Sequence, residues 1–261
     1  MIISAVVAAG VLVAWLAAMG VNRRHVRRYD GSGDPQEGII VFVEPVRWLF
    51  IIWGFSSFCR GLRHAGGRQS ARLFRWGSTA GAMLVVPDLI RRRRLERRAG
   101  RLARFLDQLA VAHPGSAIHV VGYSSGGYLA LEAGKQIGCP GRIGRIVLLA
   151  ASASPHYAWK GLEERALPIH SFHSRLDLIN IVGPLLFGSN DRKWGPSCGA
   201  VGFRRPPPTV RERSWTLADI RLGYLGDHFT ITSPAFVAAH VAPILAATQI
   251  VPPVSEAVLH G

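Results

Sequence analysis

Short runs of β-branched and other apolar residues alternate along most of the chain with longer stretches in which apolar residues recur at helical spacing. Strands that alternate with helices in this way favour a mostly parallel sheet with helices on both of its faces. The predicted strands are Ile39–Val43, Ala71–Trp76, Ile118–Val121, Arg145–Ala150, Pro168–Phe172 and Ser214–Leu217. We therefore expect an α/β fold over residues 38–248, followed by a C-terminal tail at residues 249–261.

The longest helical pattern lies between the second and third predicted strands, and it has one basic face and one apolar face. The basic face carries eight arginines between Arg91 and Arg104. Two interpretations of these arginines stay open: a solvated helix face, or a surface for anionic lipid headgroups, where each nearby basic residue contributes about 1 kcal/mol. The apolar positions recur three or four residues apart, which predicts a stripe buried against the sheet; they are Leu95, Ala99, Leu102, Leu106 and Leu109.

The N-terminus carries an uncharged apolar run from Ile2 to Val21, about the length that crosses a hydrocarbon core. A cleaved secretory signal is the alternative, but no basic side chain precedes the run. Arginines follow the run directly, at Arg23, Arg24, Arg27 and Arg28, and positive charge tends to stay cytoplasmic. The sequence thus predicts a single-pass membrane anchor at residues 1–22, a basic juxtamembrane segment and linker at residues 23–37, and a cytoplasmic body.

A second apolar stretch, Trp48–Phe58, is too short to span a bilayer, and we expect it to form a buried or membrane-facing helix. The formal net charge is +15, for which anionic lipid headgroups are the economical partner beside a membrane anchor. No zinc-finger or other nucleic-acid-binding motif is present in the sequence. The three cysteines are scattered, without the spacing of a disulfide framework or a metal site.

The stretch that indicates chemistry follows the third predicted strand and reads Gly122-Tyr-Ser-Ser-Gly126, with a helix of small and apolar residues after it. This is the G-x-S-x-G pattern in the strand–turn–helix context that makes it informative. A tight turn would lift the Ser124 hydroxyl clear of the sheet, and the glycines leave room for strand and helix to approach. At the helix N-terminus, the free N–H of Ser125 could stabilise an oxyanion.

With this motif the chain resembles the α/β-hydrolase family of serine esterases and lipases, in which the acid and then the histidine follow the serine along the chain. The matching position for the acid is Asp177, in a polar turn after the fifth predicted strand, with Asp191 as the alternative. The matching histidine is His228, in the turn Tyr224–Phe229, because His240 lies within a helical pattern and His260 lies in the tail. The resemblance implies Ser124 as nucleophile, His228 as base and Asp177 as the group that orients the base.

The chain departs from the family at the loop that supplies the second oxyanion donor. A glycine step is usual after the first strand, and this chain has Glu44-Pro45-Val46 instead. Pro45 has no N–H to donate, so the resemblance leaves Val46 as the donor. Glu44 beside an oxyanion would be unhelpful unless its carboxylate points away.

The long stretch at residues 183–208 is rich in glycine and proline and has the length of an active-site lid. The sequence therefore predicts a membrane-anchored serine hydrolase that cleaves ester or thioester substrates, including lipid-derived ones, through an acyl-enzyme. No metal or organic cofactor is implied. Two alternatives stay open: an acyltransferase on the same fold, and a non-catalytic binding or scaffold protein that has kept it.

Overall fold

A twisted sheet of six strands, in the order β2-β1-β3-β4-β5-β6, forms the centre of the molecule. The computed structural model describes residues 2–78 and 92–246. Each neighbouring pair of these strands is parallel, as the alternation of strands and helices in the sequence predicts. The strands are β1 (Asp34–Val43), β2 (Gln69–Phe74), β3 (Ile118–Tyr123), β4 (Ile143–Leu149), β5 (Ile169–His173) and β6 (Val210–Ser214).

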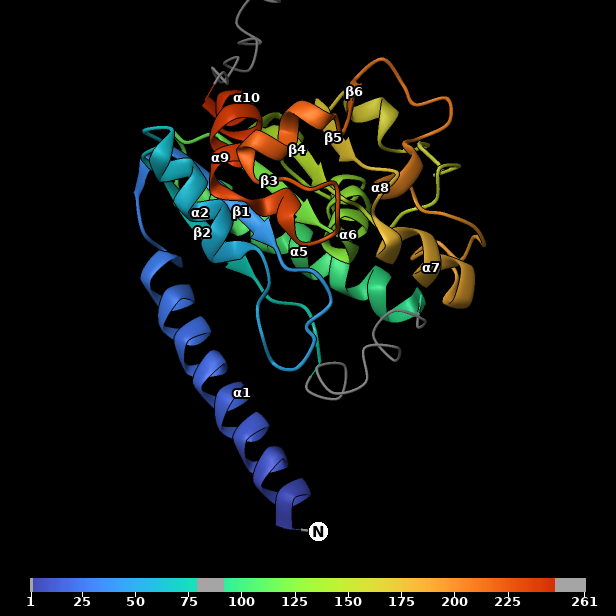
Figure 1. Cartoon of the computed structure of the whole chain (residues 1–261). Coiled ribbons are helices and arrows are strands. Elements are labelled where there is room, and N and C mark those ends of the chain that lie inside the picture. Colours follow the sequence, from blue (N-terminus) through green and yellow to red (C-terminus); the bar gives the residue numbers. More distant parts are fainter. Residues whose placement is uncertain (1, 79–91, 247–261) are drawn as a thin grey trace, which may run out of the picture.

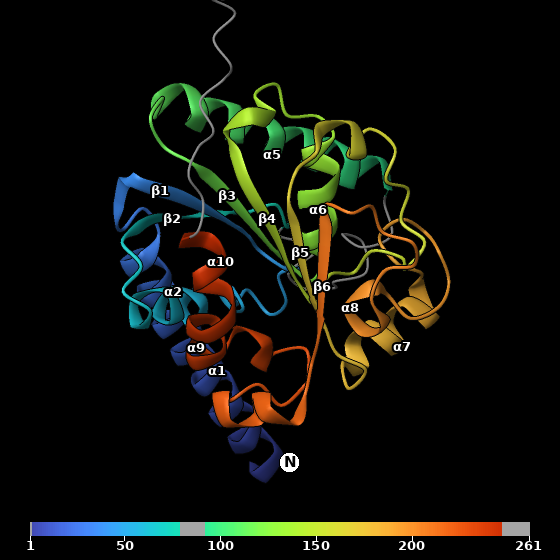
Figure 2. The same ribbon diagram turned by 90° about the horizontal axis from the view of Figure 1, so that it is seen from above.

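Helices cover both faces of the sheet: α5 and α6 lie on one side, and α2, α9 and α10 lie on the other (Figure 2). The α-helices are α1 (Ile2–Tyr29), α2 (Phe55–His64), α5 (Arg92–Ala112), α6 (Ser125–Gly134), α7 (Leu178–Phe187), α8 (Cys198–Val201), α9 (Pro234–Phe236) and α10 (Ala242–Ala246). A π-helical turn at Val237–Val241 joins α9 to α10, and short 3-10 turns occupy Pro140–Arg142, Glu163–Arg165, Leu217–Leu222 and Thr230–Thr232.

The hydrophobic core is divided by the sheet into two layers, because successive side chains of a strand point to opposite faces. Along β1, Ile39, Val41 and Val43 pack with the apolar stripe of α5, whereas Ile40 and Phe42 pack with the aromatic residues of α2 and α9. Burial on both faces explains why the inner strands read as continuous apolar runs in the sequence.

Two of the sequence predictions need correction in this part of the fold. The last strand, predicted at Ser214–Leu217, is β6 at Val210–Ser214, and Leu217 begins a 3-10 turn instead. The stretch Trp48–Phe58 is not one helix, since α2 begins only at Phe55. Gly54, before α2, has a φ of 79°, which breaks the segment into a loop and a helix.

The long helix α5 buries its predicted stripe, with Leu95, Ala99, Leu102, Leu106 and Leu109 all in the core. Its basic face is not uniformly solvated, however. Arg98 is only 5% exposed, and its guanidinium lies 5.0 Å from the ring centroid of Trp76. Arg91 lies outside the described residues, and among the side chains of this helix that the structure describes, the exposed arginines are Arg93, Arg97, Arg101 and Arg104.

The N-terminal helix α1 projects away from the body and does not end with its apolar run (Figure 1). The helix continues to Tyr29, into the region 23–37 that the sequence predicts to be a basic juxtamembrane segment and linker. Val26 is buried against the body. The side chain of Asn22 exchanges two hydrogen bonds of 2.9 and 3.0 Å with the backbone of Ile52. Within the described part of the chain, no helix combines the length and apolar character needed to cross a membrane, so the predicted transmembrane span is not supported.

The burial of Arg98 leads to a prediction about stability. Replacing Arg98 with Ala removes a desolvated cation–π contact and a buried aliphatic stem, so the free energy of unfolding should fall by about 1–2 kcal/mol. Arg97→Ala, at the neighbouring exposed position, should change it by less than about 0.5 kcal/mol. Urea unfolding of both variants measures this difference, and equal values would contradict the packing role of Arg98.

Candidate active site

Ser124 lies on a strained turn between the end of β3 and the start of α6. Its backbone has φ 54° and ψ −123°, a conformation that costs a non-glycine residue on the order of 1–3 kcal/mol. The surrounding backbone holds it there, since the Ser124 N–H donates to Leu149 O at 2.9 Å and its carbonyl accepts from Gly127 and Ser152. The serine is 8% exposed, and its hydroxyl lies at the carboxyl edge of the sheet.

The two glycines of the G-x-S-x-G pattern lie where no side chain fits. A Cβ on Gly126 would lie 2.3 Å from the carbonyl oxygen of Val43, at the end of β1. A Cβ on Gly122 would lie 2.6 Å from the Cα of Gly127, in the first turn of α6. These close approaches match the expectation that both glycines make room for strand and helix.

Ser124, His228 and Asp177 form a row of hydrogen bonds, although they come from distant parts of the chain. His228 Nε2 lies 3.0 Å from Ser124 Oγ, and His228 Nδ1 lies 2.7 Å from Asp177 Oδ2. Asp177 is 1% exposed and His228 is 7% exposed, which shields both bonds from water. The structure thus brings together the three residues that the sequence singles out.

The elements that position these side chains follow from the local sequence. Asp177 caps α7, where its Oδ1 accepts from the N–H of Asn180 at 3.0 Å. His228 lies in the loop between two 3-10 turns, and its carbonyl accepts a 2.6 Å hydrogen bond from the Tyr123 hydroxyl. Burial raises the pKa of Tyr123 well above its usual range, with the Asp177 and Asp227 carboxylates adding to the effect. The phenol therefore stays protonated and keeps its role as donor.

Asn180, a residue that the sequence analysis did not single out, joins the acid and the histidine. This asparagine is completely buried. Its Nδ2 donates to Asp177 Oδ2 at 2.8 Å and to the carbonyl of Ala150 at 2.8 Å, and it lies 3.4 Å from His228 Nδ1. Its Oδ1 accepts from the Ser152 hydroxyl at 3.0 Å. The spacing Asp177-x-x-Asn180 after a strand was the available signal, but it also describes an ordinary helix cap.

The alternative acid, Asp191, lies in a different network. Its Oδ1 accepts from the N–H of Ser154 at 2.8 Å and from the Ser189 hydroxyl at 2.6 Å. These contacts tie the turn after α7 to the loop after β4. No hydrogen bond described for Asp191 reaches His228, whereas Asp177 has one.

The carboxylate of Glu44, in the loop after β1, is bound by the residues that follow β2. Glu44 is buried, and its Oε1 accepts from the N–H groups of Trp76 and Gly77 at 3.0 and 3.3 Å. Arg47 lies 3.2 Å from the same oxygen. Burial raises the pKa of Glu44, and the charge of Arg47 and these hydrogen bonds oppose the rise. The carboxylate therefore has its own partners and serves to join the loop to the residues after β2.

An apolar cleft of about 160 Å³ opens above the Ser124 hydroxyl. Val46 and Ser125, the two expected oxyanion donors, both line it beside Ser124. α7 lines one side through Ile179 and Phe187, and this helix extends into the region in which the sequence predicts a lid. The other aromatic and apolar lining of the cleft comes from Pro45, Trp48, Trp53, Tyr123, Pro184 and Phe229.

Within residues 2–78 and 92–246, no three His, Cys, Asp or Glu side chains are grouped as metal ligands would be.

Comparison with known proteins gives a fold and no close relative. No family model and no curated protein sequence matches the chain. The structure resembles a lipase-esterase related protein of Clostridium acetobutylicum with a TM-score of 0.50 and 11% identity, over 82% of this chain and 97% of the other. It also resembles the cutinase of Trichoderma reesei, with a TM-score of 0.46 and 12% identity over 92% of each chain. A lipase of Bacillus licheniformis matches with a TM-score of 0.47 and 13% identity, over 83% of this chain and 95% of the other.

At such low identity, only the arrangement of strands and helices is comparable, and the likeness to the Clostridium protein covers most of both chains. A parallel sheet with helices on both faces, and a G-x-S-x-G turn between the third strand and its helix, belongs to one known architecture. This chain has the α/β-hydrolase fold.

Proposed function

We propose that this protein is a serine hydrolase that cleaves ester or thioester bonds through an acyl-enzyme. The observation that carries the proposal is the row of hydrogen bonds from Ser124 Oγ through His228 to Asp177, beneath an apolar cleft. A strained serine with a histidine within hydrogen-bond reach, and a buried carboxylate behind that histidine, is the arrangement by which a hydroxyl is activated as a nucleophile.

In the proposed reaction, Ser124 Oγ attacks the acyl carbon while His228 Nε2 takes the hydroxyl proton. Asp177 accepts a hydrogen bond from His228 Nδ1–H, which selects the tautomer with a free Nε2 and stabilises the imidazolium. The leaving alcohol or thiol takes the proton from His228. Water then attacks the acyl-enzyme, His228 again acts as the base, and Ser124 is released.

The negative charge that develops on the carbonyl oxygen is assigned to the N–H groups of Ser125 and Val46. Ser125 is the first residue of α6, where the free N–H groups and the helix dipole favour an anion. The engagement of Glu44 with Trp76, Gly77 and Arg47 supports this assignment, because that carboxylate has other partners and does not line the cleft.

The cleft favours substrates with an apolar acyl group. Its lining is dominated by aromatic and aliphatic side chains, and no lysine or arginine of residues 2–78 and 92–246 contributes to it. An acyl chain would bury its surface there at about 25 cal/mol per Å². We therefore assign the substrate class as acyl esters or thioesters, with lipid-derived esters among them.

Contact with anionic lipid headgroups is part of the proposal, with the exposed arginines of α5 as candidates. Replacing Arg97, Arg101 and Arg104 with Gln should weaken binding to phosphatidylglycerol vesicles and make that binding less sensitive to salt, because exposed charges are screened over about 8–10 Å at ordinary ionic strength. Vesicle co-sedimentation at several salt concentrations measures both effects. Unchanged binding and salt dependence would remove these arginines from the proposal.

The assignment of the three catalytic roles predicts a graded series of variants. Ser124→Ala and His228→Ala should abolish hydrolysis of nitrophenyl esters, and Asp177→Asn should lower kcat by about 10⁴-fold. Asp191→Asn keeps an acceptor for Ser154 and Ser189 and should retain most of the activity, which makes it the matched control. A panel of esters of graded chain length tests all four variants.

The same measurements distinguish an enzyme from a scaffold protein with this fold. A fluorophosphonate probe should label the native protein and fail to label Ser124→Ala. If the native protein neither reacts with the probe nor turns over any ester of the panel, the enzymatic proposal is wrong. A larger loss in Asp191→Asn than in Asp177→Asn would move the acid role to Asp191.

The oxyanion assignment can be tested by removing one backbone donor. Val46→Pro deletes the N–H, so kcat should fall by about 10²–10³-fold. Val46→Ala keeps the N–H and loses only side-chain packing, so its kcat should stay within a few-fold of the native value. Circular dichroism and thermal melting establish that both variants fold. Equal kcat values for two folded variants would exclude Val46 as a donor.

A further inference from the structure

The helix α7 presents an apolar surface to the outside of the molecule. It contains no charged residue, and only Asn180 and Pro184 are buried within it. Leu178 is 67% exposed and Leu186 is 61% exposed, and Val182, Leu185 and Phe187 are exposed as well. A helix on a globular surface ordinarily turns polar residues outward, and a contiguous apolar patch of this kind marks an interaction site.

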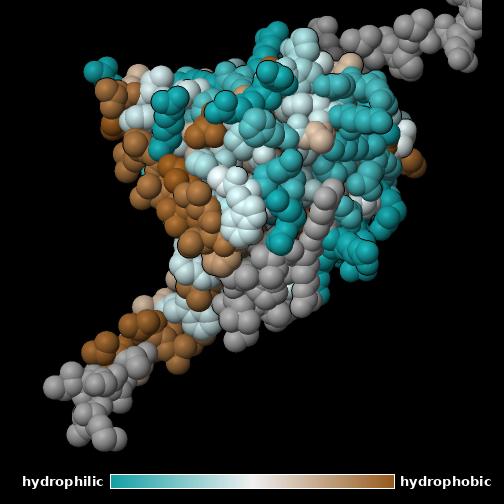
Figure 3. Space-filling model, turned by 90° about the vertical axis from the view of Figure 1, so that its right-hand side faces the viewer, coloured by the Kyte–Doolittle hydropathy of each residue, from teal (hydrophilic) through white to brown (hydrophobic). Residues whose placement is uncertain are grey.

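The apolar surface continues around the mouth of the cleft above Ser124. Trp48, Leu49 and Phe229 are each exposed by between 41% and 46%, and Trp48 and Phe229 also line the cleft. Figure 3 shows hydrophobic side chains gathered along one edge of the body and continuing toward α1. The mouth of the cleft therefore opens within an apolar surface.

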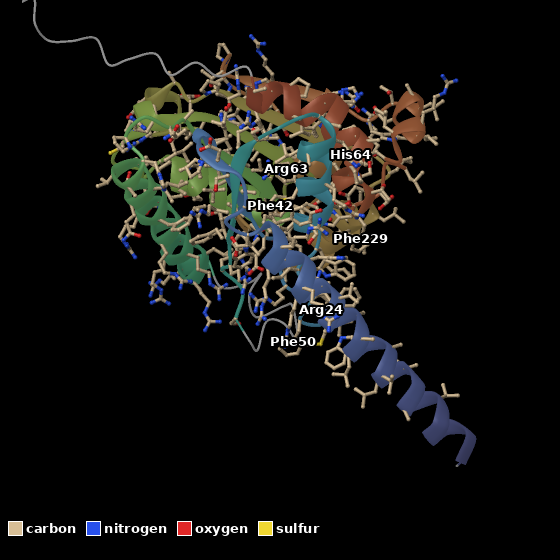
Figure 4. The ribbon with its side chains drawn as sticks, turned by 90° about the vertical axis from the view of Figure 1, so that its left-hand side faces the viewer. Arg24, Phe42, Phe50, Arg63, His64 and Phe229 are labelled. Carbon is tan, nitrogen blue, oxygen red and sulfur yellow. The ribbon has the colours of Figure 1, made fainter. Side chains whose placement is uncertain are left out.

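Aromatic contacts connect this surface to α1. The Trp15 ring lies 6.3 Å from the Phe50 ring, and the Trp15 indole N–H donates to the carbonyl of Leu49 at 3.2 Å. The ring centroids of Trp53 and Phe229 lie 5.4 Å apart. Figure 4 shows Phe50 near the part of α1 that carries Arg24. The helix is thereby held in a set direction relative to the mouth of the cleft.

The exposed apolar residues of α1 point in all directions around the helix. At 100° per residue, and counting from Val7 at 0°, Leu12, Val13 and Val21 lie at about 140°, 240° and 320° around the helix. A protein partner with a groove would match one side of a helix, whereas lipid acyl chains adapt to every side. The end of the helix nearer the body carries exposed arginines, in the same order in which the headgroup layer of a bilayer follows its acyl chains. These arginines are Arg23, Arg24, Arg27 and Arg28.

We infer that α7, the Trp48–Phe50 segment, Phe229 and the exposed apolar part of α1 together form a docking surface for a lipid bilayer. The mouth of the cleft is then pressed against the lipid, and the arginines at the end of α1 lie at headgroup level. An acyl chain can pass from the bilayer into the cleft without crossing water. This last consequence rests on the proposed hydrolase activity, but the docking itself does not.

An environment-sensitive fluorophore on α7 tests the docking directly. Cys139 is the exposed cysteine, while Cys59 and Cys198 are buried, so the full-length chain with Cys139→Ser accepts a single label at Leu186→Cys. The matched control carries the label at Val111→Cys, which is 78% exposed at the end of α5. The vesicles are phosphatidylcholine, with and without phosphatidylglycerol.

We expect the label at residue 186 to shift to shorter wavelength on vesicles and to be quenched by lipids with brominated acyl chains. The label at residue 111 should show neither effect. The result should be the same with Ser124→Ala added, so that a failure of docking and a failure of catalysis are told apart. Absence of a shift at residue 186, or an equal shift at both positions, would overturn the inference.

A kinetic comparison gives the second readout. Leu186 does not line the cleft, so Leu186→Asp should leave turnover of a soluble short-chain ester unchanged. Turnover of an ester embedded in vesicles should fall by about tenfold, because a carboxylate is unfavourable at an apolar interface. Val111→Asp should change neither rate. A loss of both rates, or of neither, in Leu186→Asp would contradict the inferred docking surface.

Discussion

The close approach of three backbone segments at Ser124 is the constraint on which the rest of the site depends. Gly126 leaves the start of α6 in contact with the end of β1, and Gly122 lets the end of β3 approach the same helix turn. Only because these contacts are so tight can the serine be held at φ 54°. Val46, Ser125 and His228 all lie around this one residue, at the same cleft.

The two buried carboxylates near the turn, Asp177 and Glu44, are held by different donors, and Oε2 of Glu44 has no hydrogen-bond partner. Asn180 joins Asp177 to the backbone after β4, so the acid has a neutral donor beside it as well as the histidine. Glu44 joins the loop after β1 to the loop after β2. Each carboxylate has donors of its own, because an unpaired buried charge would be costly. Two acidic groups can therefore lie near the cleft while only one faces His228.

The sequence was sufficient to predict the parts of the fold that leave a periodic pattern. The apolar stripe of α5, the inner strands and the G-x-S-x-G turn all do so, since burial on one or both faces dictates residue type. The edge strand β6 leaves a weak pattern, because it reads Val-Arg-Glu-Arg-Ser and is mostly exposed or half-buried, as charged edge strands often are.

Features that depend on distant partners could not be predicted. Arg98 looks like its neighbours in the sequence, and only the position of Trp76 makes it a buried residue. Asn180 likewise depends on Ala150 and His228. The direction of the Glu44 carboxylate depends on the backbone of residues 76 and 77. The sequence predicts an anchor that ends at residue 22, but α1 continues to Tyr29, where Asn22 and Val26 contact the body.

The hydrogen bond from Tyr123 to the carbonyl of His228 has a consequence for how the site comes apart. Tyr123 precedes Ser124 in the chain, so the loop that carries His228 is fastened to the strand that ends beside Ser124. A fluctuation that frees this phenol leaves a buried donor without its acceptor, which is unfavourable. The positions of Ser124 and His228 are therefore coupled through the backbone as well as through their own hydrogen bond.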